Sequence, residues 1–299
     1  MKKKLIILIS ICLIVLMAGC SQTESPKSSL VVIDSRGVEV TFDKIPEKVV
    51  SLVPSDTEIL YALNDGDKLI AVSEYCNYPD DTANKTKLPT GEKLDIENLI
   101  SLNADLVITG YMSAMEDQFK QLEAAGTKVF VTEANSLSET YEVIDMIGKV
   151  MGKEKEAATL VKNMKDGFEA IRNEVKGKAS PTIYVEVSPL EWGLWTCGKN
   201  TFIQELIDIV GAKNIFDDVE GWAEVSEEQV ISRNPDFIIT TASPLTGIND
   251  PIGEISSRAN WSGINAVRNS KIMMLNSDMI TRPGPRLLDA AKELVNILY

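Results

Sequence analysis

Residues 97–110 read ENLISLNADLVITG, and residues 228–241 read EQVISRNPDFIITT. At this offset of 131 positions, seven of the fourteen residues are identical. Internal similarity at the spacing of a domain predicts two related lobes. Strand-like and helix-like segments alternate through both halves of the chain, which predicts that each lobe is a Rossmann-like α/β unit with a mostly parallel sheet.

A long amphipathic helix is predicted between the two halves. From Glu154 to Val175 the apolar residues recur every three or four positions, which is the pattern of a helix with one buried stripe. Twenty-two residues of helix make a rod of about 33 Å. We therefore expect an N-terminal lobe over residues 31–151, a linking backbone helix over 152–178 and a C-terminal lobe over 179–299, with a ligand cleft between the lobes.

The first thirty residues read as a targeting segment. Three lysines precede an apolar run from Leu5 to Met17, which is short for a membrane span, and Ala18-Gly19-Cys20 follows. Small residues before a cysteine resemble the bacterial lipobox. This predicts a signal peptide over residues 1–19, lipidation of Cys20 and a tether over 20–30, so that the protein is extracytoplasmic and lipid-anchored to the cell membrane. An ordinary signal peptide with an incidental cysteine is the alternative.

Composition narrows the possible functions. The chain has 44 acidic and 30 basic residues, for a net charge of −14, which disfavours nucleic acid as a partner. It has no histidine, which argues against the usual protein-built metal sites, serine triads and cysteine–histidine dyads. Besides the cysteines of the targeting segment, only Cys76 and Cys197 remain, and they could form one disulfide or stay unpaired.

Aromatic residues gather in segments that we expect at the ligand cleft. In α/β sheets, ligands bind beyond the carboxyl ends of the strands. Three of the four tryptophans and at least three tyrosines fall in segments read as loops at those ends. Exposed aromatics there favour a broad, partly apolar ligand, although they could instead cover the lobe edges. Trp261 lies outside this group and is expected to pack in a core.

Glu97 and Glu228 are a second repeated feature. Each is predicted in the first turn of a helix, with Asp95 and Ser226 as N-caps and Gln229 completing a capping box. An acid at this position is favoured by the helix dipole alone. Its repetition in both halves raises a second interpretation, in which two exposed carboxylates dock onto a symmetric basic partner.

Over residues 31–299 the chain resembles the helical-backbone, or class III, substrate-binding proteins of ABC importers. The segments that carry the resemblance are VVSLVPSDTEILYAL, AVSEYCNYP, LDIENLISLNADLVI, GKNTFIQELIDIVGAKNIF, SEEQVISRNPDFII and NSDMITRPGPRLLDAAKEL. Members of this family carry vitamin B12, ferric siderophores or haem. The pattern is most similar to that of the vitamin B12 binders, although Gly91 stands where those proteins can carry a tryptophan.

The resemblance implies roles for particular residues. Trp195 and Trp222 would stack on or flank a corrin, and Asp278 and Arg282 would meet its amide side chains or nucleotide loop. Glu97 and Glu228 would pair with arginines of the permease dimer. The complete ligand-facing set that it implies is Ser55, Tyr75, Tyr111, Trp195, Trp222, Asp278 and Arg282.

These observations predict a monomeric solute-binding component of an ABC importer that binds a corrinoid. The absence of histidine fits cobalamin, because the corrin ring already holds the cobalt and no resident cofactor is needed. A ferric siderophore or haem is the alternative ligand. Two hypotheses from other functional classes are an enzyme that uses a carboxylate such as Glu97, and a sensor or adhesion lipoprotein with the same fold. The only membrane contact expected is the lipid anchor.

Overall fold

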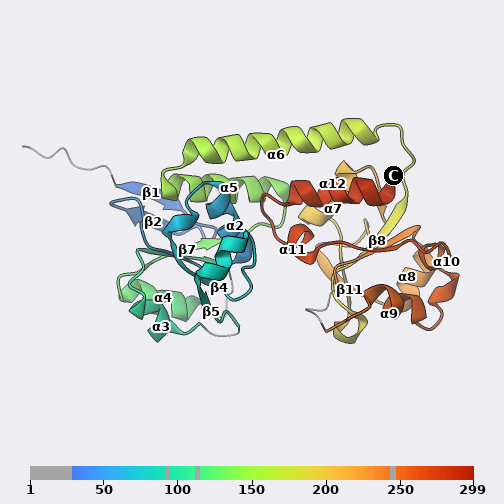
Figure 1. Cartoon of the computed structure of the whole chain (residues 1–299), viewed down its shortest axis with the longest axis horizontal. Helices are drawn as coiled ribbons and strands as arrows, with labels where there is room; N and C mark the ends of the chain where they lie inside the picture. The colour runs from blue at the N-terminus through green and yellow to red at the C-terminus, as the bar shows by residue number, and fades with distance from the viewer. Residues whose placement is uncertain (1–28, 92–93, 112–114, 243–246) are drawn as a thin grey trace, which may run out of the picture.

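A computed structural model describes residues 29–91, 94–111, 115–242 and 247–299, which form two lobes spanned by long helices (Figure 1). The expected signal peptide over 1–19 and the expected lipid site at Cys20 lie outside these residues. Within the described ranges no helix has the length and apolar character that a membrane span requires.

The first lobe is built on a five-stranded parallel sheet with the order β5-β4-β3-β6-β7. Its central strands are apolar and almost fully buried, which is typical of a parallel sheet covered on both faces. The strands are β3 (Val49–Ser51), β4 (Leu69–Ser73), β5 (Thr86–Leu88), β6 (Leu106–Gly110) and β7 (Lys128–Thr132). A separate antiparallel hairpin, β1 (Leu30–Ile33) and β2 (Glu39–Phe42), turns at the Ser35-Arg36-Gly37 segment.

The second lobe repeats this plan with a four-stranded parallel sheet in the order β10-β8-β12-β13. Its strands are β8 (Thr182–Glu186), β10 (Lys213–Asn214), β12 (Phe237–Thr240) and β13 (Ile272–Met274). A two-stranded antiparallel ribbon is added to this lobe, formed by β9 (Leu194–Cys197) and β11 (Trp222–Val225). The fold is therefore the predicted pair of α/β lobes.

Helices cover the sheets and connect the lobes. In the first lobe they are α2 (Pro54–Ala62), α3 (Ile96–Ser101), α4 (Glu116–Ala124) and α5 (Leu137–Met151), with short 3₁₀ turns η1 (Gly66–Lys68) and η2 (Asp80–Asn84). In the second lobe they are α7 (Phe202–Ile209), α8 (Glu227–Arg233), α9 (Pro251–Ser257), α10 (Asn265–Arg268), α11 (Ser277–Ile280) and α12 (Leu287–Leu298), with 3₁₀ turns η4 (Leu190–Trp192) and η6 (Trp261–Gly263).

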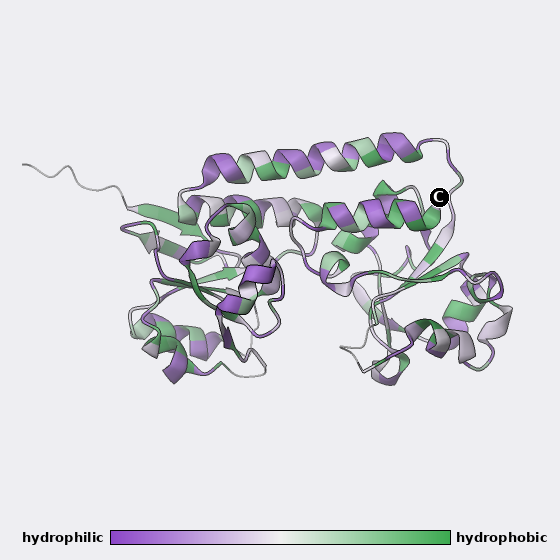
Figure 2. Ribbon diagram, viewed as in Figure 1, coloured by the Kyte–Doolittle hydropathy of each residue, from purple (hydrophilic) through white to green (hydrophobic). Residues whose placement is uncertain are grey.

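The linking helix α6 (Glu154–Val175) has the predicted bounds and lies over both lobes (Figure 1). Its buried stripe includes Val161, Met164 and Phe168, while its other face is hydrophilic (Figure 2). α6 packs against α5 of the first lobe and α12 of the second. Gly167 permits the close approach of α12, because a Cβ at this position would lie 2.6 Å from Leu288 Cδ2.

The sequence repeat is also a structural repeat. Asn103 and Asn234 each adopt a left-handed conformation after their helix, with φ of 48° and 46°. Asp105 accepts the backbone N–H groups of Glu47 and Lys48, just before β3, and Asp236 accepts the backbone N–H of Thr182 at the start of β8. These identities are explained by equivalent roles in building the two lobes.

Candidate functional site

The carboxyl edges of the two sheets face each other. Tyr75 and Asn77 follow β4 in the first lobe, and Asp278 and Arg282 follow β13 in the second. The Asn77 side-chain amide donates to Asp278 Oδ2 at 2.6 Å, and Arg282 Nη2 donates to the Tyr75 carbonyl oxygen at 3.0 Å. Parallel α/β sheets bind ligands at these edges, so the space between them is the candidate site.

Two predicted aromatic residues stand at the edge of the first lobe. Tyr75 follows β4 and is 60% exposed, and Tyr111 follows β6 and is 43% exposed. Neither is among the buried residues of the lobe's core. Both rings are therefore available to a partner at the facing edges.

In the second lobe the corresponding aromatics lie on the β9–β11 ribbon, and the prediction that they lie in loops is wrong. Trp195 is opposite Glu224 in the ladder, and Trp222 is opposite Cys197. Trp195 and Trp222 are therefore diagonal neighbours on one face of the ribbon. They are 40% and 37% exposed. Trp222 is held in place by the ring of Phe202, whose centroid lies 5.7 Å away in an edge-on arrangement.

The two remaining tryptophans differ from each other. Trp261 is fully buried, as predicted, and its indole N–H donates to Glu227 Oε2 at 2.7 Å. Trp192, in η4 just before the ribbon, is 58% exposed but was not among the predicted ligand residues. Trp192 lies three positions before Trp195 in the sequence, and this proximity could have placed it among the predicted ligand residues.

Ser55 is less accessible than the resemblance implies. Ser55 lies in the first turn of α2, which begins at Pro54. Ser55 is only 5% exposed, and a Cβ at Gly284 of the second lobe would lie 3.8 Å from its carbonyl oxygen. The next residue, Asp56, receives a 2.7 Å hydrogen bond from the Thr132 hydroxyl. Burial raises the pKa of Asp56 to about 7, so this carboxyl loses its proton only near neutral pH.

Asp278 and Arg282 meet at the facing edges, but both already have protein partners. Arg282 contacts Asp278 at 2.6 Å and Glu58 of the first lobe at 3.0 Å. Glu58 and Arg286, which sequence reasoning missed, complete the group through a second ion pair. We call Glu58, Asn77, Asp278, Arg282 and Arg286 the interlobe cluster. Sequence alone could not reveal it, because Glu58 lies 224 and 228 positions from its two arginines.

Cys76 and Cys197 are both free and buried, so the possible disulfide is absent from the structure. Cys76 lies 3.2 Å from the Thr57 hydroxyl in the first lobe, whereas Cys197 ends β9 in the second. Burial raises the pKa of each thiol, which keeps both protonated at neutral pH. In the described part of the chain, no three acidic or cysteine side chains are grouped so that they could hold a metal ion.

Glu97 and Glu228 are exposed in the first turns of α3 and α8, with the predicted caps Asp95 and Ser226 in place. Figure 1 shows these helices in the two lobes, on the side away from α6. Hydrogen bonds from its own backbone N–H and from the Ser226 hydroxyl lower the pKa of Glu228 and keep it ionised. Neither glutamate has an ion-pair partner among the described residues.

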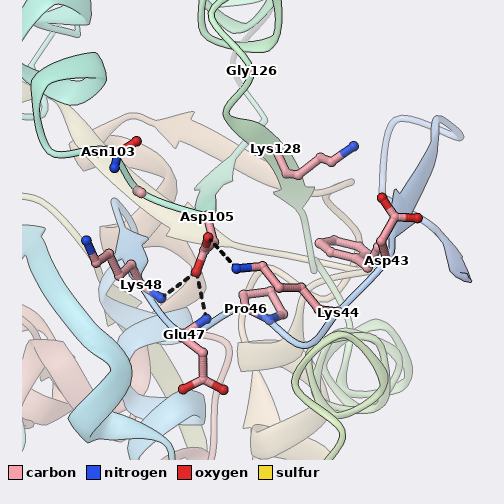
Figure 3. A pocket seen from close by; sticks show the side chains of 11 residues that line it. Asp43, Lys44, Pro46, Glu47, Lys48, Asn103, Asp105, Gly126 and Lys128 are labelled. Atoms are coloured by element: carbon pink, nitrogen blue, oxygen red, sulfur yellow. Dashed lines mark hydrogen bonds and ion pairs between the residues drawn. The ribbon is translucent and has the colours of Figure 1, made fainter. Parts of the chain in front are cut away.

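A cavity of about 590 Å³ lies at the opposite, amino edge of the first sheet (Figure 3). Three lysines line it: Lys44, Lys48 and Lys128. Asp105, at its centre, is already used by two backbone N–H groups and by Lys44 at 3.3 Å. Asp105 accepts backbone hydrogen bonds just before β3, and Asp236 does the same at the start of β8. We therefore assign Asp105 and this cavity a structural role and not a ligand-binding one.

Comparison with known proteins identifies related chains. An uncharacterized ABC transporter substrate-binding lipoprotein of Bacillus subtilis, YvrC, is 36% identical over 95% of this chain and 93% of its own length. A solved structure from Staphylococcus epidermidis, titled as a possible iron-binding (periplasmic solute-binding) protein, has 36% identity and a TM-score of 0.74. It covers 86% of this chain and 100% of its own.

The periplasmic vitamin B12-binding protein BtuF of Vibrio cholerae is similar too, with 26% identity and a TM-score of 0.69 over 85% of this chain and 97% of its own. The family model described as "Periplasmic binding protein" matches residues 49–279, which is most of the chain. All three observations indicate the same family: the two-lobed fold, the helix that joins the lobes and the similarity to these relatives. This chain belongs to the periplasmic binding protein family and is a substrate-binding component of an ABC transporter.

Proposed function

We propose that this protein binds a corrinoid between its lobes and delivers it to the permease of an ABC importer. The observation that carries the proposal is the exposure of aromatic rings in both lobes: Tyr75 and Tyr111 after strands of the first sheet, and Trp195 and Trp222 on the β9–β11 ribbon of the second lobe. Large apolar rings that no core uses are suited to the broad face of a macrocycle.

Charge at the same edges favours a ligand without net negative charge. The guanidinium groups of Arg282 and Arg286 are engaged by Glu58 and Asp278. The ammonium group of Lys87, at the edge of the first sheet, donates a hydrogen bond to the Cys76 carbonyl oxygen. An anionic chelate would have to displace these partners to reach any of these three cations, whereas a neutral corrinoid needs only amide and hydroxyl groups.

A ferric chelate, such as a ferric siderophore or haem, is the second candidate. It is supported by the Staphylococcus epidermidis structure, whose title names a possible iron-binding protein and whose identity to this chain is higher than that of the vitamin B12-binding protein. Tyr75 and Tyr111 are the exposed phenols that such a ligand would meet, and tyrosine is a known haem ligand.

The proposal includes an extracytoplasmic monomer, attached to the membrane by lipid at Cys20 and docking on the permease through Glu97 and Glu228. Two features support the anchor: the short apolar leader that ends in Ala18-Gly19-Cys20, and the description of the Bacillus subtilis relative as a lipoprotein. The proposed docking rests on the exposure of both glutamates in equivalent helices.

Calorimetric titration against cyanocobalamin, cobinamide, haemin, a ferric hydroxamate and a ferric catecholate tests the ligand. We expect one corrinoid to bind per chain with a Kd below about 1 μM, which corresponds to about −8 kcal/mol. Haemin and the two ferric siderophore models should bind at least about tenfold more weakly, a difference of about 1.4 kcal/mol. Binding of a ferric chelate in preference to both corrinoids would replace the first candidate by the second.

A further inference from the structure

The interlobe cluster is centred on Glu58, a carboxylate of the first lobe that faces two arginines of the second. Arg286 donates from Nε to Oε2 at 2.8 Å and from Nη2 to Oε1 at 2.5 Å. Arg282 donates from Nη1 to the same Oε1 at 3.0 Å. The Glu58 side chain is 2% exposed, and those of Arg282 and Arg286 are 12% and 13% exposed. Both carboxylate oxygens are therefore used across the boundary between lobes.

The rest of the cluster balances these charges. Asp278 pairs with Arg282, and Asn77 bridges them, donating to Asp278 and accepting from Arg282 Nη1 at 2.9 Å. Two carboxylates face two guanidinium groups, so the cluster is neutral. The Arg286 guanidinium also lies over the Tyr78 ring, 4.3 Å from its centroid.

Among the described residues, two further hydrogen bonds join the lobes at a second place. Near the start of α5 and α7, the Phe202 N–H donates to the Asn135 carbonyl oxygen at 2.6 Å. Beside it, the Leu137 N–H donates to Glu205 Oε1 at 3.0 Å. These two bonds tie the lobes at one place, whereas the interlobe cluster ties them at α2 and the segment from α11 to α12. The interlobe cluster consists of charged side chains, so a single substitution can remove one of its ion pairs.

We propose that Glu58 is a positioning residue that sets the spacing of the two lobes and hence the distance between their aromatic rings. Removing its charge leaves Arg286 without a counter-ion beside Arg282 in a mostly buried place. A buried charge that loses its counter-ion must either become hydrated or move away from neighbouring groups of the same charge. Either response requires the carboxyl edges to move apart, which α6 permits because it joins the lobes on the opposite side.

Glu58 is not proposed as a ligand contact. It is 3% exposed, and its oxygens are engaged by the two arginines. The inference depends on the two-lobed fold and on these contacts, not on the identity of the ligand. It is therefore tested in protein without ligand, so that it can fail while the corrinoid proposal stands, or stand while that proposal fails.

The test is the distance between nitroxide labels on the two lobes, measured by pulsed electron paramagnetic resonance. Exposed positions Lys120→Cys in α4 and Ser256→Cys in α9 carry the labels, and native Cys76 and Cys197 are 2% and 0% exposed and stay unlabelled. In Glu58→Gln, which keeps the size of the side chain, we expect the distance to lengthen by more than about 2 Å, the scale of a domain rearrangement, and its distribution to broaden.

Glu186→Gln is the matched control. Glu186 is a buried glutamate that pairs with Arg258 at 2.7 Å, but both residues belong to the second lobe. The Glu186→Gln substitution should lower the melting temperature while leaving the distance between the two labels unchanged. A Glu58→Gln protein that melts earlier but keeps the parent distance would overturn the proposal.

Should Glu58→Gln fail to fold, Arg286→Met decides the question. This substitution leaves Glu58 paired with Arg282 and removes only one of the two ion pairs of Glu58. A folded Arg286→Met protein should have a smaller lengthening in the same direction, and an unchanged distance would contradict the role assigned to Glu58.

Discussion

Changing both Glu97 and Glu228 to arginine is expected to reduce uptake of ligand at least about 100-fold, because truncating a charge pair across an interface costs about 2–5 kcal/mol and reversal adds repulsion. Both carboxylates are exposed, and neither supports the core of its lobe. The interlobe edges are untouched, so affinity for the ligand should stay within about twofold of the parent, since surface changes usually cost less than 0.5 kcal/mol. Uptake by cells and calorimetric binding separate the two effects.

Each single reversal should have an intermediate effect, because one lobe still docks. The matched control is Glu156→Arg with Glu169→Arg, which makes the same change in net charge on the exposed face of α6. If this control reduces uptake as strongly, net charge and not docking is responsible. Normal uptake by the Glu97→Arg/Glu228→Arg protein would exclude the proposed docking.

Replacing Trp195 and Trp222 together by alanine should raise the Kd for cobalamin at least about 100-fold. Central aromatic residues of a binding site commonly contribute about 2 kcal/mol or more each when truncated. Both rings extend from one face of the β9–β11 ribbon, so they act on the same side of the ligand. Calorimetric titration of the single and double variants measures the loss.

Tyr299→Ala provides the comparison for that double variant. Its exposed fraction, 41%, equals that of Trp195 within one per cent, but it lies at the end of α12 against Val210. Its affinity for cobalamin should be unchanged. Parent-like affinity in the Trp195→Ala/Trp222→Ala protein, with circular dichroism confirming the fold, would remove the aromatic residues from the site.

Local patterns in the sequence predict most of the architecture. The helix over Glu154–Val175 has the predicted ends because its apolar spacing is regular over many turns. Strands such as Phe237–Thr240 are short apolar runs bounded by polar residues, and the structure has this strand at those positions. The repeat predicts two lobes because equivalent asparagines and aspartates end the helices and begin the strands.

The failures arise where structure depends on distant partners. β9 and β11 pair across about 25 residues, so no local signal distinguishes Trp195 and Trp222 from loop residues. The start of α2, by contrast, has a local signal in Pro54, because proline is favoured at the first helical position. The partners of Glu58 depend on how the lobes meet, and no pattern within a segment encodes that.

The central claim is that the facing edges of the lobes hold a corrinoid against aromatic rings from both sides. Crystals of the protein grown with cyanocobalamin, measured at the cobalt absorption edge, locate the metal directly. We expect one anomalous cobalt peak per chain, between Tyr75 of the first lobe and Trp195 and Trp222 of the second. A peak at the amino edge near Asp105, or no peak at a saturating concentration of cyanocobalamin, would contradict it.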